Sequence, residues 1–359
     1  MKSNLINKNV MKKNSVPVDE FIDRYLYHPN KGYYMKKIPF GSNGDFITSP
    51  TISNLFSEII AIWIISSCQK LGNPNIINLV ELGPGDGSLS KVVLDIFEKF
   101  PKLNNIINYF LYDKSKYLKK IQKKKLSKYK VNWINNFNGI KNGPVIFFGN
   151  EFFDAVPIKQ FKFEKNIYYE KYYGIDKKFG IIETYKKAKV EDIKIIKLFD
   201  TYKKKKFIEL PKQGFKELDK IVEKISSLSG GILLIDYGYL KINNRDTIQA
   251  VKDNKRIDIR SLHTRFGDAD ISYLVNFGLL KEYFLKKNLK TKKIVNQKFF
   301  LERMGIHERV KILNNTMNDK QKEYMNVTLN RLLHKDIMGE LFKVIFAFNC
   351  KDNNFLGFE

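Results

Sequence analysis

The segment Glu81–Gly87 constrains what this chain can fold into more than any other feature. It has the sequence Glu-Leu-Gly-Pro-Gly-Asp-Gly, follows an apolar stretch over 75–81 that predicts a buried strand, and precedes a predicted helix over 88–100. Glycines permit backbone conformations and close approaches that other residues prevent. In dinucleotide sites the spacing is G-x-G-x-x-G, whereas here the third glycine comes one residue earlier. The segment therefore predicts a ligand-binding turn of another kind, with a purely structural turn as the alternative.

Further predicted strands follow this turn, with helices between them. They cover residues 108–113, 131–134, 144–149 and 231–237. A Lys-rich helix is predicted after the first of these, to about residue 125. Strands that alternate with helices predict an open, mostly parallel α/β sheet. Two late apolar stretches, Leu279–Leu285 and Leu341–Phe348, are the candidates for its last strands.

The remaining segments interrupt this alternation. We expect a disordered arm over 1–15 and an inserted mixed α+β segment over 160–228, in which aromatic and charged residues alternate before a helix over 214–227. The core then comprises 73–159 and 229–359.

An N-terminal region over 16–72 precedes this core. It combines a short amphipathic helix over 17–27, a loop rich in glycine and proline, and a helix from Ser53 to about Lys70. Long loops of this composition are uncommon unless they are functional, so we expect a lid, with a structural turn as the alternative.

Composition excludes several classes of protein. The only cysteines are Cys68 and Cys350, and the four histidines are scattered, so neither a disulfide framework nor a metal site is predicted. The longest apolar run, Ile59–Ile65, is far shorter than the ~20 residues that span a bilayer. The basic N-terminus lacks the apolar region of a signal peptide. We therefore expect a cytoplasmic, bacterial protein, with the mitochondrial matrix as the less favoured alternative.

The net charge of +26 would suggest a nucleic-acid ligand, but the low proportion of arginine among the basic residues argues against one. Only 8 of the 64 basic residues are arginine, the side chain that phosphate clamps and base readers prefer. Abundant Lys, Asn, Ile, Tyr and Phe are typical of AT-rich coding sequence. We favour solvated lysines over a nucleic-acid site, although the charge still favours an acidic partner surface. Nothing in the sequence predicts an oligomeric state.

Two residues after the glycine turn are candidates for contact with a nucleoside. Asp113 ends the next predicted strand, where a carboxylate can accept hydrogen bonds from ribose hydroxyls. Trp133 follows in the third predicted strand, where it would contact an adenine or pack in the core.

Three longer stretches carry a resemblance to a known family. They are Gly44–Pro50, Asn150–Pro157 and Leu234–Gly238, with weaker matches at Asp113–Gln122, Ala269–Ser272, Met304–Ile306 and Met338–Lys343. Together with the glycine turn they make the chain, from about residue 27 to 343, similar to the MidA family of class I S-adenosylmethionine-dependent methyltransferases. The resemblance implies a Rossmann-like methyltransferase core, S-adenosylmethionine as cofactor, and a lid formed by the GDFxTSP loop.

The resemblance also implies an activity. Family members methylate an arginine of the 49-kDa-type core subunit of NADH dehydrogenase (complex I) during assembly, with symmetric dimethylation as the expected product. An RNA or small-molecule methyltransferase on the same fold is one alternative. A non-catalytic complex I assembly factor is the other.

The resemblance assigns residues to the cofactor. Glu81 would anchor the methionine end, and the glycines would pass under the ligand. The expected cofactor residues are Glu81, Gly83, Gly85, Gly87, Asp113 and Trp133.

For the acceptor we expect carboxylates that hold a guanidinium, because bidentate pairing orients its plane. Glu151 and Asp154 take this role and Asn150 orients the acceptor nitrogen or the cofactor amine; the alternative for Asp154 is a helix cap. Further substrate contacts, each with a packing or turn role as its alternative, are expected from Asp45, Phe46, Thr48, Phe152, Phe153 and Tyr237.

Four positions depart from the family pattern. Thr51 stands where the family usually has Glu, Ser57 where it has Gly, and Asn276 where it has Asp. Gly149, before Asn150, stands where a small apolar residue is more usual. These departures leave the predicted cofactor site intact and bear on the choice of substrate.

Overall fold

A computed structural model describes residues 15–36, 49–52, 54–72, 74–176, 179–203, 205–240, 244–264 and 266–359. Residues 1–14 of the predicted arm and most of the predicted lid loop lie outside these ranges.

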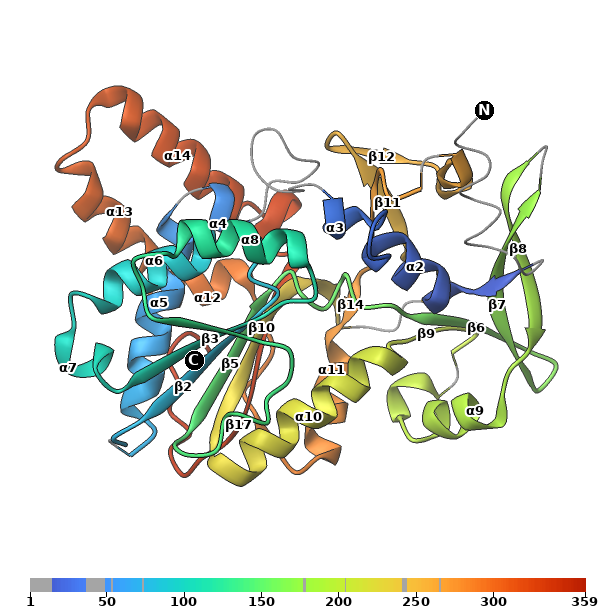
Figure 1. Cartoon of the computed structure of the whole chain (residues 1–359), viewed down its shortest axis with the longest axis horizontal. Helices are drawn as coiled ribbons and strands as arrows, with labels where there is room; N and C mark the ends of the chain where they lie inside the picture. Colours follow the sequence, from blue (N-terminus) through green and yellow to red (C-terminus); the bar gives the residue numbers. More distant parts are fainter. Residues whose placement is uncertain are drawn as a thin grey trace.

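A nine-stranded sheet forms the centre of the structure (Figure 1). Its main path runs, in spatial order, through β15 (Lys290–Thr291), β17 (Phe342–Asn349), β10 (Gly230–Tyr239), β5 (Val145–Asn150), β2 (Ile77–Leu82), β3 (Ile107–Tyr112) and β4 (Val131–Ile134). Two short strands complete it: β14 (Val275–Asn276) pairs with β10, and β16 (Val295–Asn296) pairs with β17. The strands from β10 to β4 are parallel, and β17 is antiparallel to β10. The predicted α/β class is confirmed.

Helices cover both faces of this sheet because its strands are apolar on both sides. Successive side chains of a strand point to opposite faces. Leu79 accordingly joins the cluster that includes helices α5 and α6, whereas Val80 joins the cluster that includes α10 and α11. The helices beside the sheet are α5 (Asn54–Gln69), α6 (Ser88–Phe97), α7 (Pro101–Asn104), α8 (Lys116–Lys125), α10 (Lys212–Leu228), α11 (Phe277–Lys286), α12 (Gln297–Arg303), α13 (Ile306–Asn314), α14 (Asp319–Leu333) and the π-helix η3 (Lys335–Gly339).

A second, antiparallel sheet stands beside the first (Figure 1). Its elements are β1 (Val16–Pro17), β6 (Lys159–Glu164), β7 (Ile167–Asp176), β8 (Gly180–Lys187) and β9 (Phe207–Leu210), with α9 (Val190–Lys197) and η1 (Asp200–Tyr202) between β8 and β9. The N-terminal β1 pairs with β7, so the start of the described chain is tied to the predicted insertion. Helix α10 also falls within 160–228, but it packs on strands β5, β10 and β17 of the central sheet.

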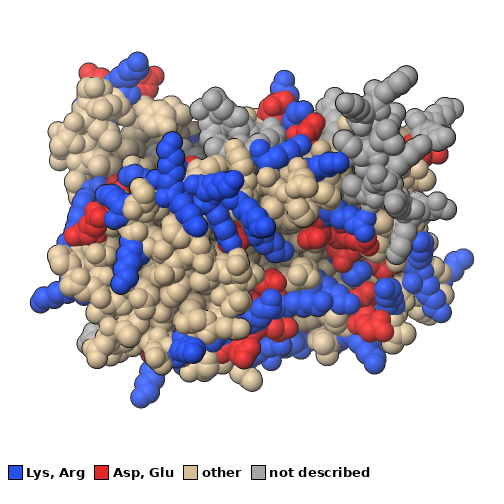
Figure 2. All heavy atoms as spheres, in the orientation of Figure 1, with Lys and Arg blue, Asp and Glu red and all other residues tan. Residues whose placement is uncertain are grey.

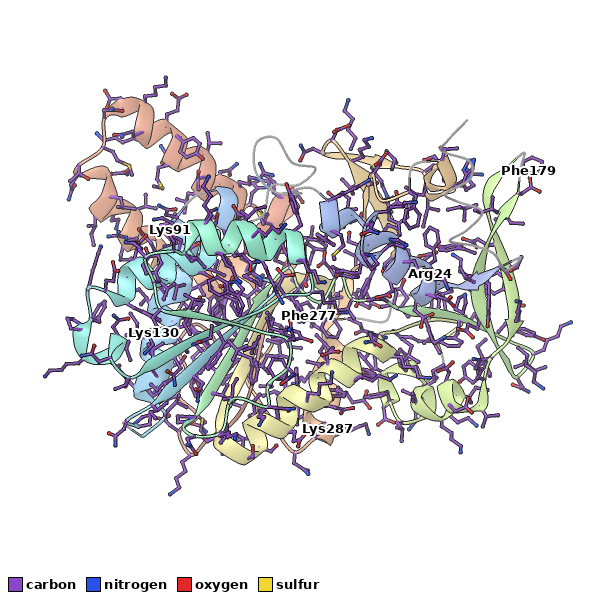
Figure 3. The ribbon with its side chains drawn as sticks, viewed as in Figure 1. Arg24, Lys91, Lys130, Phe179, Phe277 and Lys287 are labelled. Atoms are coloured by element: carbon purple, nitrogen blue, oxygen red, sulfur yellow. The ribbon has the colours of Figure 1, made fainter. Side chains whose placement is uncertain are left out.

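The remaining elements are α2 (Val18–Tyr27), α3 (Tyr33–Lys36), α4 (Ser49–Ile52), β11 (Gln249–Lys252), β12 (Lys255–Ile257), η2 (Ile259–Thr264) and β13 (Asp270–Ser272). They include a small third sheet in the order β12-β11-β13, and α4, which contacts α5 and α6 (Figure 1). Figure 3 marks the fully buried Phe277 near the middle of the molecule and the exposed Phe179 at the tip of the β7–β8 hairpin.

One predicted strand is wrong. Residues 279–285 form helix α11, whereas the stretch over 341–348 does form a strand, β17. The buried residues Leu279, Leu280, Tyr283 and Phe284 recur at helical spacing, which marks one face of a helix. Asn276 caps this helix, because its side chain accepts a hydrogen bond from the backbone N–H of Leu279 at 3.1 Å.

Candidate active site

The glycine turn lies at the carboxyl end of β2, where open α/β sheets bind ligands. Gly83, Gly85 and Gly87 all have positive φ, at 63°, 56° and 83°. A Cβ on Gly83 would also lie 2.9 Å from a ring carbon of Phe152. The backbone conformation and the lack of space therefore both require glycine at position 83.

Glu81 supplies a buried carboxylate beside this turn. Its Oε2 accepts hydrogen bonds from the hydroxyls of Ser90 and Tyr109. Burial raises the pKa of Glu81 to about 7, against these two hydrogen bonds. Glu81 also lines a small cavity together with Gly83 and Gly85.

Asp113 directly follows β3 and is held by two donors. The backbone N–H of Ser115 donates to its Oδ1 at 2.7 Å, and the Gln122 side chain donates to its Oδ2 at 2.8 Å. The same Gln122 nitrogen donates to the carbonyl of Gly85 at 2.8 Å, which ties the carboxylate to the glycine turn. Burial raises the pKa of Asp113 to about 6. Gln122 was not predicted to take part, although it ends one of the weaker family matches.

Trp133 lies behind this arrangement. Its indole N–H donates to Oε1 of Gln122 at 3.0 Å, and Trp133 is not among the described residues that line either cavity of the site. The structure thus places Trp133 as a support for Gln122, and its predicted contact with the cofactor stays a prediction.

Two adjoining cavities meet at Glu151. The smaller is lined by Glu81, Asn150 and the glycine turn; the other is lined by Tyr27, Tyr34, Tyr112, Asp113, Phe152 and Glu217, among others. Gly83, Gly85 and Glu151 line both. Glu151 therefore lies between the space beside the glycine turn and the larger space beyond it.

The conformation of Glu151 is unusual. It has a positive φ of 51°, which is rare for a residue other than glycine and is found preferentially at functional sites. Its backbone N–H donates to the carbonyl of Ile235 at 2.9 Å, and its Oε1 accepts from the Asn150 side chain at 3.0 Å. Burial, reinforced by the charge of Asp154, raises the pKa of Glu151 to about 8.

Asp154 and Asp236 complete a cluster of buried carboxylates. Oδ2 of Asp236 accepts from the backbone N–H groups of Phe153 and Asp154, at 2.9 and 3.1 Å, and so fixes the loop after β5. Asp154 receives a hydrogen bond from the Tyr237 hydroxyl. Burial raises the pKa of both carboxyl groups. In the described part of the chain, no lysine or arginine forms an ion pair with Glu151, Asp154 or Asp236.

The two phenylalanines of the predicted substrate site have different positions. Phe152 lies against Gly83 and lines the larger cavity. Phe153 is 2% exposed, packs against Gly214 and belongs to the core cluster. The structure therefore gives Phe153 the packing role that the sequence left as its alternative. Tyr237 packs edge-on against Phe342 and reaches the site through its hydroxyl on Asp154.

Two tyrosines that were not predicted line the larger cavity. The Tyr27 hydroxyl donates to the carbonyl of Ala155 at 3.1 Å, and the Tyr34 hydroxyl donates to Oδ1 of Asp270 at 2.8 Å. Their rings stack, with centroids 5.7 Å apart. They come from α2 and α3, so the N-terminal helices close one side of the site. The predicted substrate contacts Asp45, Phe46 and Thr48 lie outside the described residues.

These residues fit S-adenosylmethionine. Oδ1 of Asn150, beside Glu81 in the smaller cavity, is buried without a hydrogen-bond partner among the described residues, and an ammonium group can supply one. Asp113 can accept from ribose hydroxyls, and the glycine turn leaves room for a ligand against its backbone. Within the described ranges, no group of three or more His, Cys, Asp or Glu side chains could hold a metal ion.

A parallel sheet of this order, with a glycine turn after its first strand and a carboxylate after the second, defines a class I S-adenosylmethionine-dependent methyltransferase. The chain belongs to the family described as "Putative S-adenosyl-L-methionine-dependent methyltransferase", whose model matches residues 59–295. It is therefore a methyltransferase that uses S-adenosylmethionine.

Named relatives match over nearly the whole chain. Protein arginine methyltransferase NDUFAF7, mitochondrial, from Xenopus laevis is 29% identical over 94% of this chain and 83% of its own. The human protein of the same name is 26% identical over 91% of this chain and 78% of its own. A crystal structure from Burkholderia thailandensis with S-adenosyl-homocysteine bound has a TM-score of 0.82 at 20% identity, covering 99% of this chain and 95% of that one. The last comparison confirms the predicted class I fold.

The relatives overturn one prediction. The curated relatives are named as mitochondrial proteins, which contradicts the predicted location in a bacterial cytoplasm. The composition of the N-terminus did not discriminate between these compartments. No helix in the described ranges is long and apolar enough to cross a membrane.

Proposed function

We propose that this methyltransferase modifies an arginine of a protein, and that Glu151 and Asp154 hold the acceptor guanidinium. The observation that carries the proposal is the buried carboxylate cluster, which lacks a basic partner for Glu151 and Asp154 in the described chain although the protein as a whole has a net charge of +26. Buried carboxylates without a partner are costly, and a cation that enters the site would compensate them. A guanidinium is planar and suits bidentate pairing.

The chain's own residues can prepare this acceptor for methylation. When bound, S-adenosylmethionine supplies an electrophilic methyl group. Asn150 and the backbone N–H of Ser49, 3.4 Å from Glu151 Oε1, fix the carboxylate of Glu151. Tyr237 fixes Asp154. The acceptor nitrogen gains a carbon and loses a proton, and an ionised Glu151 is the base beside it.

Phe152 and the two tyrosines enclose the larger cavity and exclude water from it. Exclusion of water strengthens the pairing of carboxylate and guanidinium, and it holds the acceptor in a geometry suited to in-line attack.

The substrate that we propose is the 49-kDa-type core subunit of NADH dehydrogenase, with symmetric dimethylation in mitochondria. The resemblance to the MidA family and the names of the mitochondrial arginine methyltransferases support it.

The test is transfer of label from isotopic S-adenosylmethionine into a mitochondrial extract that lacks this protein, followed by mass spectrometry of peptides and RNA. We expect label on one arginine of the NADH dehydrogenase subunit, lost with Glu151→Gln and retained with Glu98→Gln, which changes an exposed carboxylate. Label in RNA would contradict the proposal, and so would cofactor binding without any transfer, as in a non-catalytic assembly factor.

A further inference from the structure

Helix α8 differs from the other helices in its charge. It contains six lysines and no acidic residue, whereas every other described helix of eight or more residues has a net charge between −2 and +1. A coding bias toward lysine would act on all helices alike. The concentration of lysine on this one helix therefore needs a local explanation.

Three of these lysines form one exposed row. Lys116, Lys120 and Lys124 are spaced four residues apart, on the side of α8 opposite its buried residues Leu118 and Gln122. The three are exposed, and within the described chain they have no hydrogen bond, ion pair or ring contact. Figure 2 shows basic side chains gathered over the face where Figure 1 places α8.

The row begins at the active site. Asp113, Lys114 and Leu118, which lead into α8 and form its first turn, line the larger cavity. The amino end of α8 therefore lies at the wall of the larger cavity, next to Asp113, and a polypeptide that approaches Glu151 along this wall passes α8. The helix is about 15 Å long at ~1.5 Å per residue, and an extended substrate covers that length in about five residues at ~3.3 Å each.

We propose that the face formed by Lys116, Lys120 and Lys124 binds acidic residues of the protein substrate within about five positions of the acceptor arginine. This inference rests on the proposed arginine methylation. The site then discriminates twice by charge: the buried carboxylates select the arginine, and the exposed lysines select its acidic surroundings. An acidic peptide suits this face better than nucleic acid, because α8 contains no arginine for bidentate phosphate contacts.

The test compares two fluorescent peptides of about 15 residues, each with one central arginine flanked by either Glu or Gln. Methyl transfer gives the KM, and fluorescence anisotropy gives binding independently of the reaction. The test variant is Lys116→Glu/Lys120→Glu/Lys124→Glu.

The matched control is the variant Lys99→Glu/Lys102→Glu/Lys130→Glu, which makes the same change in charge at three exposed lysines. These lysines lie near the amino ends of β3 and β4, at the edge of the sheet opposite the active site; Lys130 is marked in Figure 3.

We expect the Glu peptide to have a KM about tenfold lower than the Gln peptide, because exposed charge pairs each contribute modestly. The difference should shrink at high salt, disappear in the α8 variant and persist in the control. Equal KM values in the wild-type protein, or a difference that survives in the α8 variant, would overturn the inference while arginine methylation stands. An equal loss for both peptides would also overturn it, because the lysines would then support folding or the cofactor.

Two further outcomes separate the proposals. If neither peptide is methylated but anisotropy still shows α8-dependent binding of the Glu peptide, the proposed function fails and the acidic-segment surface stands. If an oligouridylate of equal charge displaces the Glu peptide at a lower concentration than the unlabelled Glu peptide does, α8 is a nucleic-acid surface and the inference is wrong.

Discussion

The two halves of the proposed active site are built in different ways. On the cofactor side, Glu81, the glycine turn and Asp113 lie within one strand–turn–helix–strand unit, and their main partners, Ser90, Tyr109 and Gln122, come from the same short stretch of chain. On the acceptor side, Glu151 and Asp154 are held by segments that are far away in the sequence. The cofactor side is therefore a local structure, whereas the acceptor side exists only when the whole chain has folded.

Long-range contacts define the acceptor side. Asp236 holds the loop that carries Asp154 from 82 residues away, and Tyr34 reaches Asp270 across 236 residues. The carboxylates brought together have raised pKa values because they are buried near one another. Burying these carboxylates together lowers the stability of the free protein, and a bound cation would offset this loss of stability. The comparison implies that substitutions should affect one half without the other.

The largest effect is expected from Glu151→Gln. The amide keeps the size of the side chain but cannot accept the proton or pair with a guanidinium, so kcat should fall by about 10²–10⁴-fold. Steady-state methyl transfer gives the rate, and calorimetry gives the affinity for S-adenosylmethionine. An affinity loss as large as the rate loss would show that the two halves are not separable.

The pH dependence of the two halves should also differ. The pKa of Glu151 is raised to about 8, so the ionised form that can accept a proton predominates only above that pH. The value of kcat/KM for the acceptor should therefore rise roughly tenfold per pH unit up to about pH 8. If Glu81 and Asp113 bind the cofactor as predicted, their pKa values of about 7 and about 6 imply that cofactor affinity levels off at a lower pH. If the residual kcat/KM of Glu151→Gln still rises with pH up to about pH 8, another group is responsible for the rise.

Gly83→Ala is expected to disturb the cofactor side. The substitution forces a side chain into a positive φ and against Phe152, at a cost of ~1–3 kcal/mol, and should lower the affinity for S-adenosylmethionine by about tenfold or more. Gly72→Ala is the control, because it has a similar φ of 81° with nothing within 4 Å. Titration calorimetry and thermal unfolding distinguish a local loss of affinity from a general loss of stability. Similar cofactor affinities for the two variants would contradict close packing at position 83.

A smaller effect is expected from Tyr34→Phe. It removes the hydroxyl group that donates a hydrogen bond to Asp270, while the stacked ring remains. The value of kcat/KM for the acceptor should therefore fall by several-fold to about tenfold, in line with the ~0.5–1.5 kcal/mol net contribution of one hydrogen bond. Cofactor affinity should hardly change. Tyr117→Phe, on the exposed part of α8, is the control. A kcat/KM like that of the control would show that Tyr34 only fills space.

Local pattern was enough to predict the turn and the sheet on the cofactor side. The spacing of Gly83, Gly85 and Gly87 predicted a ligand-binding turn, and the alternation of strands and helices predicted the parallel sheet around it, whereas the contacts of Asp113 with the cofactor stay a prediction. The resemblance to the MidA family also named Glu151 and Asp154. The prediction failed where an apolar stretch had two interpretations: the segment over 279–285 has the apolar content of a buried strand, but its spacing is that of a helix.

Tertiary structure alone decided the rest. It placed Trp133 behind Gln122 and Phe153 in the core, and it brought Tyr27 and Tyr34 from the N-terminal helices to the larger cavity of the site. The physical reason is the distance along the chain over which each interaction acts. Backbone conformation and hydrophobic spacing depend on residues that are near neighbours in the chain, so they can be predicted from the sequence. Burial and the mutual repulsion of carboxylates depend on which distant segments meet, and only the folded chain determines that.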